Sequence, residues 1–400
     1  MYTDEIKKLC NKYLNDIISF RHQFHMYPEL GHKEFKTAKA VADELRRLNI
    51  EVTENVSGTG VIGILEGKYP GKTVLLRADM DALPIQENAD VPYKSRVDGV
   101  MHACAHDGHT ATLLGVAMVL SELRDQLHGT VKFVFQPDEE YGDGAKSMVE
   151  GGILENPHVD AAFGLHLWGS FLEGHVKVKH GPAMAAPDKF IFKVIGKGGH
   201  GSTPHLCVDP VMITVQAINN MQSIISRRKS TFNPAVISFC SIKAESEYNT
   251  IPEVVEVIGT IRTFDPSLRL WIIDAMEQVL KGTAECQGAK YEFVIDEDYA
   301  LPPVINDYKL TDLVQNAAEK IIGKENVEAL REPLMAAEDY AYFSQAVPSS
   351  FFFVGISPDG NEVTHHSPNF QWDDKVLYTS VRVLSFIKYE FIKLIFITSG

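Results

Sequence analysis

The chain has 400 residues, of which 45% are hydrophobic and 23% are charged. This size and composition are typical of a globular protein with roughly two to three domains of ~150 residues, and they exclude a disordered or collagen-like chain. The 53 acidic and 38 basic residues give a formal net charge of −15. Such a surface repels polyphosphates and anionic membranes, so we expect neither nucleic acid nor a membrane as a partner.

The cysteines and the two ends of the chain indicate in which cellular compartment the protein is located. Residues 1–20 form an amphipathic pattern with interspersed charges and lack the apolar core of a secretory signal. Five cysteines, an odd number without a C-x-x-C pair, argue against a disulfide framework and suggest that one has a chemical role. Lys388, Glu390 and Lys393 interrupt the apolar C-terminus, which predicts a helix rather than a membrane span. These features predict a cytoplasmic protein.

The first part of the chain alternates buried strands with helices. Nearly continuous runs of Val, Leu and Phe predict strands at 73–79, 130–136 and 160–168, and helices are expected at about 107–125 and 143–152. Such strands with helical crossovers are typical of a parallel sheet that is buried on both faces. We therefore predict an α/β fold with a mostly parallel central sheet flanked by helices.

From about residue 188 the order changes to β-α-β-β-α-β. The predicted strands and helices lie at 188–196, 209–227, 235–243, 253–264, 267–286 and 289–297. This order is that of the split βαβ, or ferredoxin-like, arrangement, and it ends at Pro302-Pro303. We predict that residues 187–299 form an inserted domain, and that residues 1–186 and 300–400 form its host.

The densest group of metal-competent side chains is MHACAHDGHTA at 101–111, directly before an apolar helix. At an extended strand end, Cys104 and His106 would point to the same side and reach one ion or two adjacent ions. The alternative is a capped helix start, with Asp107 as the cap and the histidines solvated. The spacing alone leaves both interpretations open.

Further acids and histidines follow other predicted strands. QPDEE places Glu139 and Glu140 after a buried strand, where open α/β sheets bind ligands, although such a pair alone is more often solvated. His166 follows a third strand, although a lone histidine among apolar residues is usually part of the core, and His365-His366 follow SSFFFVGI. Together they predict two divalent metal sites, in which one carboxylate binds metal while its neighbour moves protons.

Nine motifs occur in a fixed order along the chain. They are RADMDALP (77–84), HACAHDGHT (102–110), QPDEE (136–140), GLHLW (164–168), GKGGHGSTPH (196–205), YNTIP (248–252), GTIR (259–262), MAAEDY (335–340) and HHSP (365–368). The series resembles the aminoacylase-like amidohydrolases and carboxypeptidases, two-metal peptidases that include hippurate hydrolases, thermostable carboxypeptidases and auxin-conjugate hydrolases. The resemblance covers essentially the whole chain.

The resemblance implies a role for each motif in the host domain. The ligands of two divalent ions, Zn²⁺, Mn²⁺ or Co²⁺, would be Cys104, His106, Glu140, His166 and His366. Glu139 would be the general base that takes a proton from a metal-activated water. Asp79 stands where related peptidases carry a histidine ligand, so Cys104 would fill that vacancy, and Asp81 would orient the ligands. Ala105 stands where many relatives have Gly, and this change removes no ligand.

The resemblance also gives the inserted domain a role as a lid and dimerisation domain. His200, in a Gly-rich segment that on its own predicts only a tight turn, would reach across a homodimer and stabilise the oxyanion at the neighbour's metals. Asn249 and Arg262 match residues that bind polar groups of the substrate. An arginine suits a carboxylate, although an ordinary strand-end ion pair explains Arg262 equally well.

The sequence therefore predicts a metal-dependent amidohydrolase that cleaves N-acetyl- or N-benzoyl-L-amino acids, or releases C-terminal residues from short peptides. One alternative is a non-catalytic relative that binds metal or ligand, but such a protein has no use for the base Glu139. Another is a hydrolase of the same fold that acts on acetyl-diaminopimelate or on carbamoyl amides.

Overall fold

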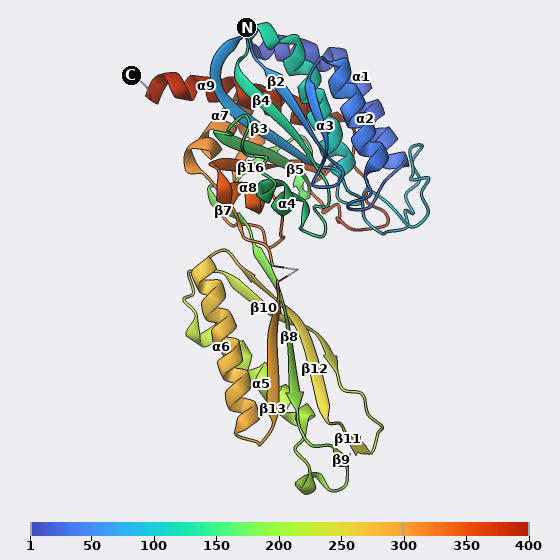
Figure 1. The fold of residues 1–400 in the computed structure, drawn as a ribbon, viewed down its shortest axis with the longest axis vertical. Coiled ribbons are helices and arrows are strands. Elements are labelled where there is room, and N and C mark those ends of the chain that lie inside the picture. The colour runs from blue at the N-terminus through green and yellow to red at the C-terminus, as the bar shows by residue number, and fades with distance from the viewer. Residues whose placement is uncertain (1, 298–299, 399–400) are drawn as a thin grey trace. The chain divides into compact units, whose positions relative to one another are not determined.

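The computed structural model describes residues 2–297 and 300–398, which divide into two compact units. Unit 2 consists of Met184–Pro303 with Leu334–Glu338, and unit 1 consists of the rest of the described chain (Figure 1). Unit 1 therefore contains both the first and the last helix. The function of unit 2 as a lid and dimerisation domain stays a prediction.

Unit 1 is built on an eight-stranded sheet in the order β1-β2-β4-β3-β5-β16-β6-β15. Its strands are β1 (Glu51–Val56), β2 (Gly60–Glu66), β3 (Tyr69–Asp79), β4 (His128–Gln136), β5 (Ala161–Leu172), β6 (Val176–Val178), β15 (Val327–Ala329) and β16 (Ser349–Ser357). The central strands β4, β3, β5 and β16 run parallel, which confirms the mostly parallel sheet. Pairs β1-β2, β2-β4 and β16-β6 are antiparallel, and β7 (Gly181–Met184) pairs separately with β14 (Val304–Asn306).

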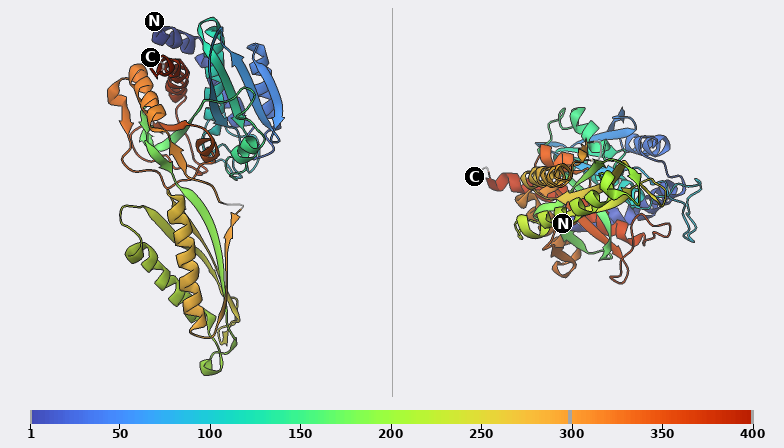
Figure 2. Two further views of the ribbon diagram at one scale, coloured as in Figure 1. Left: turned by 60° about the vertical axis from the view of Figure 1, so that its left-hand side comes forward. Right: turned by 90° about the horizontal axis from the view of Figure 1, so that it is seen from below.

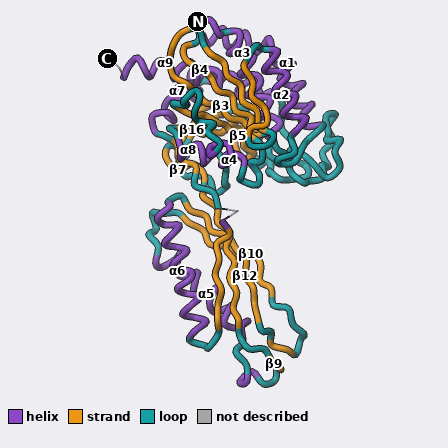
Figure 3. The backbone as a smooth tube through the Cα atoms, viewed as in Figure 1, coloured by secondary structure: helices purple, strands orange, loops and turns teal. Residues whose placement is uncertain are grey.

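Helices cover both faces of this sheet (Figure 3). They are α1 (Tyr2–Met26), α2 (Phe35–Arg47), α3 (His106–Glu122), α4 (Gly144–Glu150), α7 (Tyr308–Ile322), α8 (Ala341–Ala346) and α9 (Lys375–Thr398). The long helices α1, α2, α3, α7 and α9 share one apolar core with Val74 and Leu76 of β3. Because side chains alternate along a strand, Arg77 points to the other face, toward the side of α4 and α8. In the described part of the chain, no helix has the length and hydropathy needed to cross a bilayer.

Unit 2 has a four-stranded antiparallel sheet in the order β10-β12-β8-β13. Its elements are β8 (Ala186–Ile195), α5 (Pro210–Ser223), β10 (Ala235–Lys243), β12 (Val254–Thr263), α6 (Pro266–Glu285) and β13 (Lys290–Asp296), with a small pair β9 (Gly199–His200) and β11 (Thr250–Ile251). Their order along the chain is the predicted split βαβ arrangement. Each helix begins at an Asp-Pro pair, where Asp209 or Asp265 caps the first backbone N–H groups and proline occupies the first turn.

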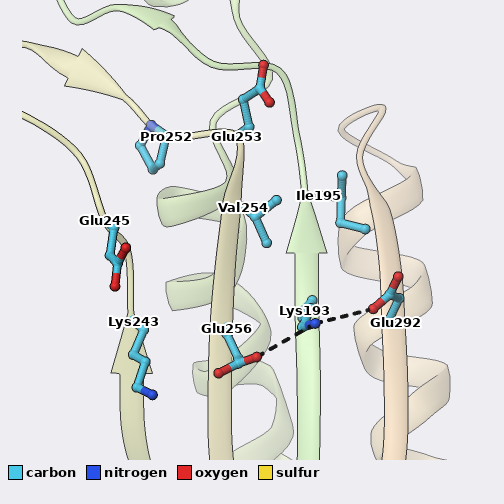
Figure 4. Close-up of a pocket in the computed structure, with 9 residues that line it drawn as sticks. All are labelled: Lys193, Ile195, Lys243, Glu245, Pro252, Glu253, Val254, Glu256 and Glu292. Atoms are coloured by element: carbon cyan, nitrogen blue, oxygen red, sulfur yellow. Dashed lines mark ion pairs between the residues drawn. The ribbon is translucent and has the colours of Figure 1, made fainter.

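The two faces of the unit 2 sheet differ. Helices α5 and α6 cover one face (Figure 2), toward which Phe190, Phe192 and Val194 point. On the other face Lys193 lies between Glu256 and Glu292, with Nζ–O distances of 3.7 and 3.8 Å (Figure 4). These ion pairs line a shallow hollow of about 600 Å³. Glutamates outnumber lysines in the lining, so the hollow is acidic, and solvated ion pairs of this kind contribute little stability.

Candidate metal centre

The metal-competent residues of unit 1 gather at the carboxyl ends of the parallel strands. Glu139-Glu140 follow β4, and His366 lies in the loop after β16. His166 is in the interior of β5, which continues to Leu172, so the prediction that it follows its strand is wrong. The pairing of β3 with β5 ends at Gly164, so His166 lies two residues beyond the last β3 pair, while on its other side it still pairs with Phe353 of β16.

Cys104 and His106 flank a left-handed residue rather than sharing an extended strand. Ala105 has a φ of 66° and precedes α3, which begins at His106. The strand-end geometry predicted for the two ligands is wrong, because this left-handed turn redirects the chain into a helix. A glycine would adopt the same conformation without the cost of a Cβ. The turn nonetheless places the Cys104 sulfur and a His106 ring nitrogen within 4.8 Å of each other.

Three groups of potential ligand atoms that contain only predicted ligands and the predicted base overlap at this point, and within each group all atoms lie within 4.8 Å of one another. The groups are Cys104-His106-His166, Cys104-Glu140-His366 and His106-Glu139-Glu140. All five residues predicted as ligands, and the predicted base, are thus brought together. Cys104 belongs to two of the groups, so its sulfur lies between two potential ion positions.

Two buried atoms in the cluster lack a hydrogen-bond partner among the described residues. They are Nε2 of His106 and Oε1 of Glu140, which lie 3.9 Å apart. Oε1 of Glu140 is also 3.4 Å from His366 Nε2. Leaving a buried polar atom without a hydrogen bond costs about 1–3 kcal/mol. Two such atoms that face each other therefore indicate that a ligand binds between them.

Hydrogen bonds determine which histidines have a free ring nitrogen. His109 Nδ1 contacts Asp79 at 2.6 Å, and its Nε2 accepts the N–H of Leu167 at 2.9 Å, so both nitrogens are occupied. His166 Nδ1 donates to the Leu167 carbonyl at 2.8 Å, which leaves Nε2 unprotonated and 3.5 Å from Cys104 Sγ. His166 can therefore bind a metal, whereas His109 supports β5.

Asp81 holds two of the candidate ligands in place. Its Oδ1 lies 3.2 Å from His106 Nδ1, and its Oδ2 accepts the backbone N–H of Glu140 at 3.0 Å. The carboxylate thus fixes the His106 tautomer with Nδ1–H toward Asp81 and Nε2 toward the cluster. This geometry supports the orienting role predicted for Asp81.

The charges around the cluster favour a cation. Burial opposes protonation of His106, but Asp79, Asp81 and Cys104 outweigh it and hold the pKa of His106 well above its usual value. The neighbouring Cys104 sulfur and the Glu140 carboxylate raise the pKa of His366 to about 10. Protons thus occupy two ligand nitrogens in an acidic site, and a divalent ion would replace them.

His166 and Cys104 differ from these two residues. Burial and the neighbouring His109 and His365 hold the pKa of His166 well below its usual value, so its ring is neutral. Burial and the Glu140 charge raise the pKa of the Cys104 thiol. Without a cation the sulfur is therefore protonated, and a bound metal would be needed to keep the thiolate.

A buried ion-pair network supports the cluster from the α4 side of the sheet, and sequence reasoning missed it. Arg77 donates to Asp79 and to Asp339, each at 2.8 Å, and to Gln136 at 2.7 Å. Asp339 also accepts from Gln136 and from the N–H of Ala145. The available signal was an arginine within the apolar strand TVLLRAD, because a fully buried arginine needs paired acceptors.

Asp107 anchors the start of α3 and does not cap it. The residue is buried and contacts Arg21 at 3.3 Å and His25 at 2.9 Å, both on α1. His25 in turn contacts Glu87 at 3.2 Å. Because the N-terminal turn of α3 has no side-chain cap, and His106 and His109 are buried, the interpretation as a capped, solvated helix start is wrong.

The three predicted residues of unit 2 lie at two ends of its sheet. His200 in β9 pairs with Thr250, and Gly201 donates to the Asn249 carbonyl at 2.7 Å, so His200 and Asn249 are neighbours. Arg262 pairs with Pro187, at the opposite end of β8. Within one chain, Asn249 and Arg262 therefore do not converge on one group.

Arg262 is a half-buried arginine that has no ion-pair partner among the described residues. Its guanidinium donates to the carbonyl of Ile261 at 3.2 Å and to the hydroxyl of Thr260. Burial lowers its pKa, although Asp188 opposes this. Asp188 itself is paired with Arg269. The interpretation of Arg262 as an ordinary strand-end ion pair is thus not supported.

Comparisons with known proteins agree with this site. Residues 75–387 match the model of peptidase family M20/M25/M40, and the chain belongs to this family. It is 41% identical over 382 residues to thermostable carboxypeptidase 1 of Saccharolobus solfataricus, covering 94% of this chain and 95% of the relative. It is 43% identical over 307 residues to the N-acyl-L-amino acid amidohydrolase of Geobacillus stearothermophilus, covering 76% and 82% of the two chains.

A solved structure extends the similarity to the whole fold. The YXEP protein of Bacillus subtilis, a dinuclear metal binding peptidase from the M20 family, superposes with a TM-score of 0.83. Its sequence is 32% identical, and the match covers 96% of this chain and 99% of that protein. The predicted family resemblance and α/β fold are confirmed.

Proposed function

We propose that this protein is a metal-dependent amidohydrolase that cleaves N-acyl-L-amino acids, such as N-acetyl and N-benzoyl derivatives, or C-terminal residues of short peptides. The observation that carries the proposal is the pair of unsatisfied atoms, His106 Nε2 and Glu140 Oε1, beside the Glu139 carboxylate. The relatives named as an amidohydrolase and a carboxypeptidase support the same reaction class.

Two divalent ions fit the residues present. Cys104, His106 and His166 offer one set of donors, and Cys104, Glu140 and His366 offer another. A thiolate combined with imidazoles favours Zn²⁺ or Co²⁺ over the harder Mn²⁺, and all three remain candidates. When bound, such ions lower the pKa of water and polarise an amide carbonyl.

The residues of the chain would then perform proton transfer and substrate binding. Glu139 Oε2 lies 3.9 Å from His106 Nε2, so the carboxylate is placed to take a proton from an attacking water and pass it to the leaving nitrogen. Asp81 and Asp79 keep the ligands oriented. Arg262, unpaired by any carboxylate in the described chain, would bind the free α-carboxylate of the substrate.

We further infer that two copies associate through unit 2. Strand β10 is an edge of the sheet and leaves one row of backbone groups unpaired. Helix α5 exposes Met212 and Val215, and the turn before it exposes Leu206. In the dimer His200 and Asn249 would act at the partner's site. Analytical sedimentation should show a dimer, and the His200→Ala variant should be inactive. A fully active monomer would contradict the inference.

Metal removal tests the proposed function. A strong chelator should lower hydrolysis of N-acetyl- and N-benzoyl-amino acids by at least about 100-fold, and Zn²⁺, Co²⁺ or Mn²⁺ should restore it. The same chelator presaturated with Ca²⁺ is the control. Because a bound ion must displace at least the His366 proton, which is held with a pKa of about 10, metal affinity should fall at least about tenfold for each pH unit lowered. Hydrolysis that is indifferent to the chelator would exclude the proposal.

The alternatives make different predictions in the same assay. A non-catalytic relative would bind metal without turnover, and the presence of Glu139 among the ligands disfavours it. A hydrolase for acetyl-diaminopimelate or carbamoyl amides would show its preference when acyl and amino-acid halves are varied separately. We also propose a cytoplasmic location, which the five unpaired cysteines support.

A further inference from the structure

His365 and His366 are adjacent in sequence but have different surroundings. His366 faces Glu140, whereas the half-buried ring of His365 lies against Trp168 and Phe370, with ring centroids 5.1 and 4.9 Å away. The groups of potential metal ligands contain His366 but not His365. The function proposed above gives His365 no role.

Hydrogen bonds determine which nitrogen of His365 carries the hydrogen. Nε2 accepts the backbone N–H of Gly169 at 2.9 Å, so the hydrogen of the neutral ring is on Nδ1. Nδ1 lies 3.7 Å from Cys104 Sγ, which is within the range of an N–H···S hydrogen bond. His365 therefore points a donor at the sulfur and has no lone pair left for a metal.

His166 does not supply this donor. Its Nε2 lies 3.5 Å from the same sulfur, but its hydrogen is on Nδ1, which donates to the Leu167 carbonyl. A bare lone pair beside the sulfur suits a cation that both atoms share. His365 thus presents a hydrogen-bond donor to the Cys104 sulfur, whereas His166 presents a lone pair.

Strand β5 fixes the position of the donor. The N–H of Gly169 donates to His365, and the carbonyl of Gly169 accepts the N–H of Val363 at 2.9 Å. Both backbone polar groups of Gly169 therefore hold the loop that carries His365. A Cβ on Gly169 would lie 1.8 Å from the Val363 carbonyl oxygen. Only glycine permits this close approach, and the ring nitrogen is therefore in place before an ion binds.

We infer that His365 is a positioning residue that donates a hydrogen bond to the Cys104 thiolate and sets its donor strength toward the metals. The inference rests on the proposed role of Cys104 as a shared ligand. An N–H donor withdraws electron density from the sulfur and orients its lone pairs, so the bound ions stay more electrophilic. A residue that only anchored the loop would not change the electronic state of the sulfur.

Two substitutions separate these roles, because asparagine places its amide near the position of Nδ1 and glutamine places its amide near that of Nε2. His365→Asn retains a donor toward the sulfur. His365→Gln retains an acceptor for Gly169 and removes that donor. Each protein is loaded with Co²⁺, its thiolate-to-cobalt charge-transfer band is recorded, and Cys104→Ser assigns the band.

The band of His365→Gln should move to longer wavelength, since a sulfur without its hydrogen bond gives up an electron more easily. Competition with a chelator should show Co²⁺ affinity weakened by about 10–100-fold, because the sulfur loses the N–H that orients it and stabilises its thiolate charge, while His365→Asn stays close to the unchanged protein in both measurements. A band that does not move in His365→Gln, or that moves equally in both variants, overturns the inference. If the unchanged protein has no thiolate band at all, Cys104 is not a ligand, and the proposed metal site fails with it.

Discussion

Glu139→Gln is expected to lower kcat for amide hydrolysis by about 10²–10⁴-fold, with metal content and unfolding midpoint unchanged. The substitution keeps the shape of the side chain but removes its ability to accept a proton. Glu139 Oε2 lies in the group formed with His106 and Glu140, and its backbone is in the turn directly after β4. The side-chain amide of the variant therefore occupies the place of the Glu139 carboxylate but cannot act as a base.

Steady-state kinetics together with elemental analysis measure this effect. Glu140→Gln should instead lose metal, because Glu140 supplies a buried oxygen that has no hydrogen-bond partner in the described chain. Glu150→Gln, an exposed change at the end of α4, is the matched control and should stay within about twofold of full activity. Near-full activity of Glu139→Gln would contradict the proposed base, and loss of metal in this variant would make Glu139 a ligand.

The strands at the centre of the fold were predictable because burial on both faces leaves a continuous apolar pattern. This applies to the runs TVLLRAD and TVKFVFQ, which form the ends of β3 and β4. The antiparallel edge strand β1 was not predicted, since its sequence EVTENV is half exposed and mostly polar. Strands β6 and β15 have only three residues each, too few for a period of two to be recognised.

Motif order was sufficient to nominate the ligands, but not their local geometry. The left-handed φ of Ala105 determines how Cys104 and His106 approach each other, and an alanine gives no signal of such a conformation. The roles of His109 and His365 depend on backbone N–H groups of Leu167 and Gly169, which come from another strand. Sequence spacing carries no information on these tautomers.

The same limit explains why the pairing of Arg77 with Asp339 was missed. The two residues are separated by 262 positions, and neither lies in a sequence motif that indicates its partner. Once the fold brings them together, they extend the metal site to the opposite face of the sheet, because Arg77 also holds Asp79. Although burial opposes ionisation of Asp79, His106, Arg77 and His109 keep its pKa well below the usual value.

Asp339→Ala should therefore lower the free energy of unfolding by about 3–5 kcal/mol, the usual cost of leaving a buried charge without its partner. Arg77 is fully buried, and the substitution also removes the acceptor of Gln136 and of the Ala145 N–H. Urea unfolding of the metal-free protein measures the loss. Asp43→Ala, which breaks an exposed pair with Lys39 on α2, is the control and should cost less than about 1 kcal/mol.

Metal affinity distinguishes a general loss of stability from a specific effect on the site. With Asp339 absent, Arg77 should turn from Asp79, so the ligand cluster should bind metal about 10–100-fold more weakly even where the variant is fully folded. Asp339→Asn keeps one acceptor oxygen and should lose less in both measurements. A stability loss within 1 kcal/mol would contradict the inferred dependence of Arg77 on Asp339. A large loss with unchanged metal affinity would instead show that the network serves the fold alone, and that Asp79 holds its position without it.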